Sequence, residues 1–195
     1  MSRIEPLTRE DLPEFADYFA QRDATNELVG NPMLTMARRP NILNGFLGLL
    51  QAVYHEGEVS ASLKRLIAFM RSSAAGCQFC QAHASNSASK HGIETEKIEA
   101  IWEFEDSPLF SDAERAALRL ARDAAQLPNL ATDEHFEDLR KYYDEGQIVE
   151  IVAVISLFAY LNNWNDTVAS TLEAGPLAFA EEHLVSHGWS VGKHA

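Results

Sequence analysis

Apolar residues recur at intervals of three and four positions along most of the chain, and strict alternation of apolar and polar residues is scarce. The first spacing places side chains on one face of an α-helix, whereas alternation is typical of a half-buried strand. We therefore predict an all-α fold. Its expected helices cover residues 12–21, 42–56, 61–75, 77–90, 113–127, 133–143, 147–166 and 177–187.

Capping signals support several of these boundaries. Ser111 and Glu114 match the capping box, in which a hydroxyl and a carboxylate satisfy free N–H groups of the first helical turn. Ser60 and Thr132 stand where N-caps are expected. Residues 30–42 contain two prolines and are interpreted as a connector.

The composition is that of an ordinary globular domain. Hydrophobic residues make up 46% of the 195 positions and charged residues 23%, which is enough apolar material for a real core. We expect a single domain with three parts: an N-terminal helical extension over residues 1–59, a helical core over 60–188 and a loose tail over 189–195.

Net charge and hydropathy limit which partners and which cellular compartment we expect for the protein. The chain has 16 Lys and Arg against 29 Asp and Glu, a net charge of −13, so nucleic acid is an unexpected partner. Residues 148–161 are apolar but shorter than the roughly 20 residues of a membrane span, and they include a glutamate. No signal peptide is recognisable, and we expect a cytoplasmic protein without membrane contact.

The only two cysteines of the chain lie close together. Cys77 and Cys80 are three residues apart at the expected start of a helix, and His83 follows three residues later. First-turn N–H groups favour a thiolate and a nearby histidine can take its proton, so the spacing suits dithiol redox chemistry. Two buried hydrophobic cysteines are one alternative. A zinc site is another, but it needs about four ligands and the other histidines are scattered.

A polar cluster ends the long apolar helix. Asn162 and Asp166 lie four residues apart, so they share one helix face and could point into a pocket. The alternative is an ordinary helix C-terminus with turn-forming asparagines.

The segment from Leu63 to Ile93, with the sequence Gly-Cys-x-x-Cys between two helices and a histidine in the second, resembles the carboxymuconolactone decarboxylase and alkyl hydroperoxidase D superfamily. More narrowly, it is similar to an uncharacterised peroxidase-related branch, over about residues 60–184. The resemblance implies a helical fold, a homo-oligomer, and peroxide reduction by Cys77 and Cys80 without a bound cofactor. Because only Cys77, Cys80 and His83 are grouped as candidate ligands, we also expect a metal-free protein. A thiol or dithiol reductant would regenerate the enzyme.

The sequence departs from the hydroperoxidase pattern in its proton relay. Arg65 occupies the position of a relay glutamate, and His83 lies one residue earlier than the family histidine. Arg65 could stabilise a thiolate, or it could be a solvated or inter-subunit residue. Asp166 or Glu150 could replace the missing acid by approaching His83.

We assign Cys80 as the attacking thiol because His83 lies one turn away, and Cys77 as its resolving partner. The opposite assignment has support, since Cys77 is nearer the helix N-terminus. The alternatives in function are a non-redox enzyme of the decarboxylase type and a redox-sensing or binding oligomer without turnover.

Overall fold

The structure, a computed structural model, describes residues 2–25 and 28–195, and in these residues it is helical without strands, as the sequence predicts. The α-helices are α1 (Ala16–Ala24), α2 (Asn31–Met36), α3 (Pro40–Leu50), α4 (Ala61–Ala74), α5 (Gln78–Lys90), α6 (Thr95–Glu99), α7 (Asp112–Asp123), α8 (Asp133–Leu139), α9 (Glu145–Val168) and α10 (Ala174–His183). A π-helical turn, η3 (Gln51–His55), extends α3. Short 3₁₀ turns are η1 (Arg9–Asp11), η2 (Pro13–Phe15), η4 (Ala100–Glu103), η5 (Val185–His187) and η6 (Gly192–His194).

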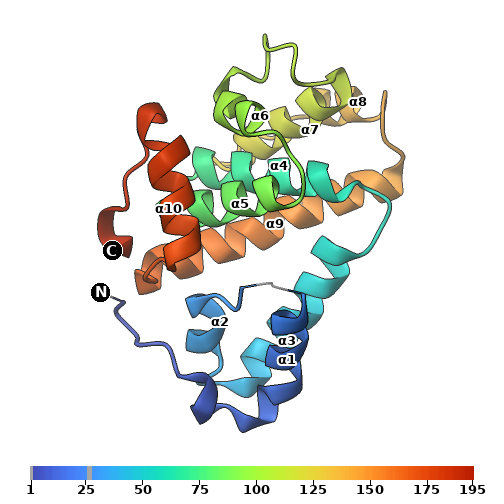
Figure 1. Ribbon diagram of the computed structural model, residues 1–195. Helices are drawn as coiled ribbons and strands as arrows, with labels where there is room; N and C mark the ends of the chain where they lie inside the picture. Colours follow the sequence, from blue (N-terminus) through green and yellow to red (C-terminus); the bar gives the residue numbers. More distant parts are fainter. Residues whose placement is uncertain (1, 26–27) are drawn as a thin grey trace.

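The long helix α9 runs through the middle of the fold (Figure 1). Helix α4 packs extensively against α5, α7 and α9, and α10 packs against α5. In Figure 1 the N-terminal helices α1–α3 lie below α9, and α6–α8 lie above it. Every residue of α4 from 63 to 72 is buried, because this helix is covered on all sides by its neighbours.

Local signals in the sequence locate most helix starts. Ser60 accepts a hydrogen bond from the N–H of Leu63, and Ser111 and Glu114 form the expected capping box. The connector interpretation of residues 30–42 is wrong, because Asn31–Met36 form helix α2. Pro32 is tolerated there since it stands in the first turn, where its missing N–H is not needed.

The C-terminal segment is packed rather than loose, which corrects the prediction for residues 189–195. Trp189 is buried and donates its indole N–H to the carbonyl of Gln78. His194 is 1% exposed, and its carbonyl accepts from the N–H of Leu172. The segment therefore belongs to the wall around helix α5.

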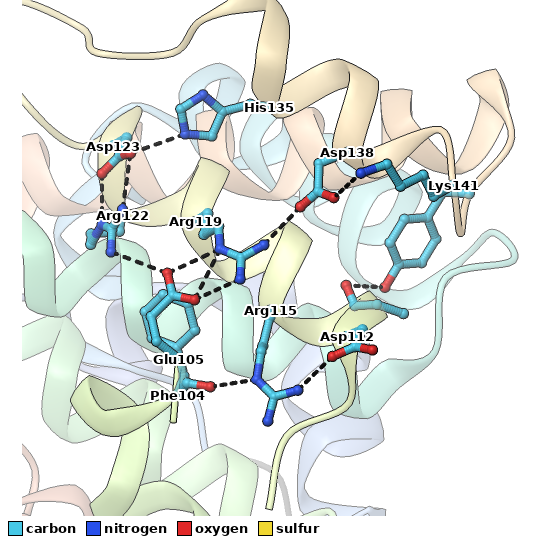
Figure 2. A network of polar contacts seen from close by, with 12 residues as sticks. Phe104, Glu105, Asp112, Arg115, Arg119, Arg122, Asp123, His135, Asp138 and Lys141 are labelled. Carbon is cyan, nitrogen blue, oxygen red and sulfur yellow. Dashed lines mark hydrogen bonds and ion pairs between the residues drawn. The ribbon is translucent and has the colours of Figure 1, made fainter. Parts of the chain in front are cut away.

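An ion-pair network fixes α7 and α8 on the loop after η4 (Figure 2). Arg119 binds Glu105 with a shortest contact of 2.6 Å and reaches Asp138 at 2.8 Å. Next to it, Asp123 accepts from Arg122 and from His135. These groups are partly exposed and none of them lines the pocket described below, so the network holds the far side of the fold.

Helix α9 is the one helix of the described chain that is long and apolar enough to cross a membrane, with a mean hydropathy of 1.3 over its most apolar window. It packs along α4 and α5 and carries buried asparagines that are hydrogen-bonded to other helices. Those contacts fit the core helix of a soluble bundle, and the cytoplasmic location stays a prediction.

One side of α9 exposes apolar side chains, and we predict that it packs against a second copy of the chain. Val149 is 67% exposed, and Val152 and Tyr160 are exposed with it. Light scattering at micromolar concentration should give the mass of an oligomer, because such side chains gain most from burial. Replacing both valines by glutamate should yield a monomer, and Val185→Glu, also at an exposed valine, should not. A monomeric wild type would contradict the prediction.

Candidate active site

A pocket of about 530 Å³ opens between the N-terminal helices and the pair α5 and α9. Its wall is mainly apolar, with Cys80, His83 and Asn165 among its polar groups. The lining residues are Arg22, Thr25, Leu28, Gly30, Pro32, Met33, Phe46, Leu50, Tyr54, Arg65, Phe79, Cys80, His83, Ala84, Asn86, Ser87, Lys90, His91, Phe158, Leu161 and Asn165. The N-terminal part, expected only as an extension, thus supplies part of the site.

A tight turn between α4 and α5 presents the cysteines. Gly76 has a φ of +72°, a conformation that side chains disfavour, and it reverses the chain directly before Cys77. Cys77 is the N-cap of α5 and Cys80 lies in its first turn. Both are free, buried thiols, but only Cys80 lines the pocket.

The two thiols differ in acidity. Burial raises the pKa of Cys80, but hydrogen bonds from Cys77, Asn165 and Asn162 outweigh it and lower that pKa below its usual value. The pKa of Cys77 is raised, chiefly because its thiol donates to the Cys80 sulfur and also because it is buried next to that charge. Of the two thiols, Cys80 is therefore the more acidic one.

Asn165 of α9 holds the Cys80 sulfur. Its side-chain N–H₂ group lies 3.3 Å from Cys80 Sγ, and its oxygen accepts from the hydroxyl of Ser170 at 2.8 Å. Ser170 is placed there because Ala169 adopts a left-handed conformation that ends α9. The carbonyl of Ser170 in turn bonds His194 Nδ1, so the packed tail supports the thiol site indirectly.

His83 forms a pair with a glutamate that the sequence did not suggest. His83 Nε2 lies 2.6 Å from Glu173 Oε2, and its ring stacks on Phe79 at 4.4 Å between centroids. Burial raises the pKa of Glu173, but the bond to His83 and the N–H of Asn31 outweigh this and lower it. A carboxylate that accepts from Nε2–H leaves Nδ1 as the basic nitrogen of a neutral His83.

The structure corrects the expected partner of His83. Asp166 is 35% exposed and contacts Lys193 and His194 instead. Glu150, the other candidate, pairs with Lys64 and accepts from the N–H of Glu58. The acid in contact with His83 is Glu173, 90 residues away and N-cap of α10, where no local pattern could reveal it.

A second arginine, Arg71, lies near the two thiols. Burial lowers the pKa of Arg71, and the neighbouring Cys80 and Cys77 act in the opposite direction. Arg71 also donates to Asn162 Oδ1 at 3.2 Å, and Asn162 donates to Ser72. Arg65 is not a solvated residue, because its side chain is buried and lines the pocket.

The difference in pKa between the two thiols predicts how each cysteine reacts with an alkylating agent. In the reduced protein, Cys80 should be alkylated with a pH midpoint below the ordinary thiol pKa of about 8.5, because its hydrogen bonds stabilise the anion. Peptide mapping by mass spectrometry separates the two sites. Asn165→Leu, which keeps the size but loses the donor, should raise the midpoint. A midpoint at or above 8.5 in the wild type would disprove the activated thiolate.

Within residues 2–25 and 28–195, no three His, Cys, Asp or Glu side chains gather in a way that could hold a metal ion. The prediction of a metal-free protein stays a prediction, to be checked by elemental analysis.

Sequence comparison connects the chain with a protein family and with two known proteins. The model of the carboxymuconolactone decarboxylase family matches residues 40–123, a range that crosses the boundary we expected at residue 60. The protein YdfG of Bacillus subtilis is 28% identical over 111 residues, which are 56% of this chain and 74% of YdfG. YnjA of Escherichia coli is 32% identical over 81 residues, 42% of this chain and 44% of YnjA.

Solved structures match over almost the whole chain. A cysteine-to-alanine variant of the debrominase Bmp8, in complex with 2,3,4-tribromopyrrole, is 34% identical with a TM-score of 0.85, covering 92% of this chain and 96% of Bmp8. A peroxidase-related protein from Ralstonia eutropha JMP134 with an AhpD core has a TM-score of 0.79 at 18% identity, covering 90% and 94%. At 18% identity, the similarity to the Ralstonia eutropha protein supports the fold alone.

Proposed function

We propose that this chain, which belongs to the carboxymuconolactone decarboxylase and alkyl hydroperoxidase D-like superfamily, is a thiol-dependent oxidoreductase that reduces a small organic substrate. An alkyl hydroperoxide is the first candidate substrate. One observation carries the proposal: Cys80 is the thiol that lines an apolar pocket, and Cys77 hydrogen-bonds its sulfur from the buried side.

In the first step the Cys80 thiolate attacks the terminal oxygen of the hydroperoxide. The O–O bond breaks, the sulfur is oxidised to a sulfenic acid, and the alkoxide leaves as an alcohol. His83 holds the proton of the Cys80 thiol and returns it to the departing alkoxide. Glu173 fixes the imidazole by its bond to Nε2, as the third group of a nucleophile, base and carboxylate set.

In the second step the Cys77 thiol attacks the oxidised sulfur. A disulfide forms and the sulfenic oxygen leaves as water, with the Cys77 proton. The pKa of Cys77 is raised mainly by its hydrogen bond to Cys80, and this cause disappears once Cys80 is oxidised. The pKa of the resolving thiol should therefore fall only after Cys80 has been oxidised. A thiol or dithiol reductant then restores the pair by disulfide exchange.

Reductive dehalogenation of an aromatic ring is the second candidate. The similarity to the debrominase Bmp8, at 34% identity over nearly the full length of both chains, favours it. The pocket wall also contains the rings of Phe46, Tyr54 and Phe158, which suit a flat ligand. Here the Cys80 sulfur would take the halogen as the ring takes a proton, and Cys77 would displace halide by forming the disulfide.

Turnover with a regenerating dithiol reductant tests the proposal and separates the candidates. Cumene hydroperoxide and 2,3,4-tribromopyrrole are supplied in turn, and alcohol formation and bromide release are measured against a Cys80→Ser blank. We expect alcohol formation. Bromide release alone would favour the second candidate. If the cysteines were oxidised once but the protein did not turn over, it would be a redox sensor. If neither substrate oxidised the thiols, the remaining alternative would be a non-redox enzyme.

A further inference from the structure

The charged side chains of the pocket have one sign. Those that line it within the described residues are Arg22, Arg65 and Lys90, together with two histidines, and no aspartate or glutamate is among them. The whole chain has almost twice as many acidic as basic residues and a net charge of −13. A cationic pocket in so acidic a protein attracts small anions and concentrates them at its mouth.

Arg65 is the deepest of these cations. It is 3% exposed, and its guanidinium carbon lies 5.2 Å from the centre of the Tyr54 ring. One of its terminal N–H groups donates to the carbonyl of Ala61 at 2.9 Å, while Nε has no partner. Among the described residues no carboxylate pairs with it, although burying a charge is costly without one.

The neighbouring residue Lys64 is also a buried cation of α4, but its charge is paired within the chain. Lys64 is 1% exposed, forms an ion pair with Glu150 at 3.0 Å and donates to the carbonyl of Val53 at 2.9 Å. The chain thus supplies a carboxylate to the buried cation that faces away from the pocket. No carboxylate of the described residues pairs with Arg65, which lines the pocket, so its charge is available to a ligand.

We infer that the pocket takes an organic anion and that Arg65 binds its carboxylate or phenolate by charge-assisted hydrogen bonds. The apolar body of the ligand contacts the aromatic wall, and its reactive group lies at Cys80. The inference rests on the proposed function for the reaction, and it names the substrate class: a small acid that also carries the hydroperoxide or halogen.

Binding of an unreactive pair of ligands tests this without turnover. Naphthoate and its neutral analogue naphthamide are titrated calorimetrically into the reduced wild-type protein. We expect naphthoate to bind at least about tenfold more tightly, since hydrogen bonds to charged groups are among the stronger ones. Equal affinities, or no naphthoate binding up to millimolar concentration, would overturn the inference. Failure of peroxide turnover would not.

Variants assign the preference to Arg65. Arg65→Gln should abolish the preference for naphthoate with naphthamide affinity unchanged, and Arg65→Lys should retain part of it. Lys141→Gln, which removes the same charge from an exposed side chain outside the pocket, should change it by less than about twofold. Thermal unfolding checks that each variant is folded. A preference that survives in Arg65→Gln, or that falls equally in Lys141→Gln, would refute the role of Arg65.

Discussion

Replacing Cys80 by serine is expected to lower peroxide reduction by at least about 10³-fold, to the level of the reductant alone. The serine hydroxyl keeps the size and the hydrogen bond from Asn165, but it is not ionised at neutral pH and cannot receive the peroxide oxygen. Steady-state consumption of cumene hydroperoxide measures the loss. Unchanged thermal unfolding would show that the fold is intact.

Cys77→Ser is the matched control, because it removes the other thiol of the pair. It should retain one stoichiometric oxidation of Cys80 and lose most of the subsequent turnover, since no thiol is in place to resolve the sulfenic acid. If Cys77→Ser lost the first oxidation and Cys80→Ser retained it, the roles of the two cysteines would be the reverse of those proposed.

The second large effect is expected at the carboxylate behind His83. His83→Ala should lower peroxide turnover by about 10² to 10⁴, the usual cost of losing a positioned acid–base group. Glu173→Gln should lower it by at least about tenfold, because glutamine can still accept from the N–H of Asn31 but no longer supports a charged His83. The double variant should be no worse than His83→Ala alone.

Control variants distinguish a positioned acid–base group from a purely structural one. Glu173→Gln removes the carboxylate that holds His83 Nε2, so its turnover should fall while its thermal unfolding stays unchanged. Asp166→Asn is the control, since it removes a carboxylate that pairs with Lys193 and His194, and it should lower turnover by less than about threefold. An effect of Asp166→Asn as large as that of Glu173→Gln would contradict the assignment of the relay.

The parts of the site that could be predicted from the sequence are those with local signals. The helix starts at Ser60 and Ser111 depend on contacts within one turn. Cys77, Cys80 and His83 belong to a single turn and helix, so their spacing alone brings them to one place. The choice of Cys80 as the attacking thiol, made because His83 lies one turn away, stays a prediction, and the structure adds that Cys80 is the thiol that lines the pocket.

The parts that could not be predicted depend on packing between distant segments. Glu173 meets His83 across 90 positions, and it does so only because α10 packs along α5. Arg65 follows another basic residue in a helix that would ordinarily expose both, yet α4 is enclosed on all sides and buries them with different partners. The helix α2 and the docked tail at His194 were missed because proline and glycine obscure short helical turns.

The central claim is that Cys80 and Cys77 act as one redox pair, and a single-turnover thiol titration tests it most directly. The reduced protein is treated with one equivalent of cumene hydroperoxide without reductant. Free thiols are then titrated, and the mass of the peptide containing both cysteines is measured by mass spectrometry. A dithiol reductase should lose both thiols per equivalent of alcohol formed, and the peptide should carry an internal disulfide that a reductant reverses. Two intact thiols, or a peptide of unchanged mass after the hydroperoxide is added, would contradict the dithiol mechanism.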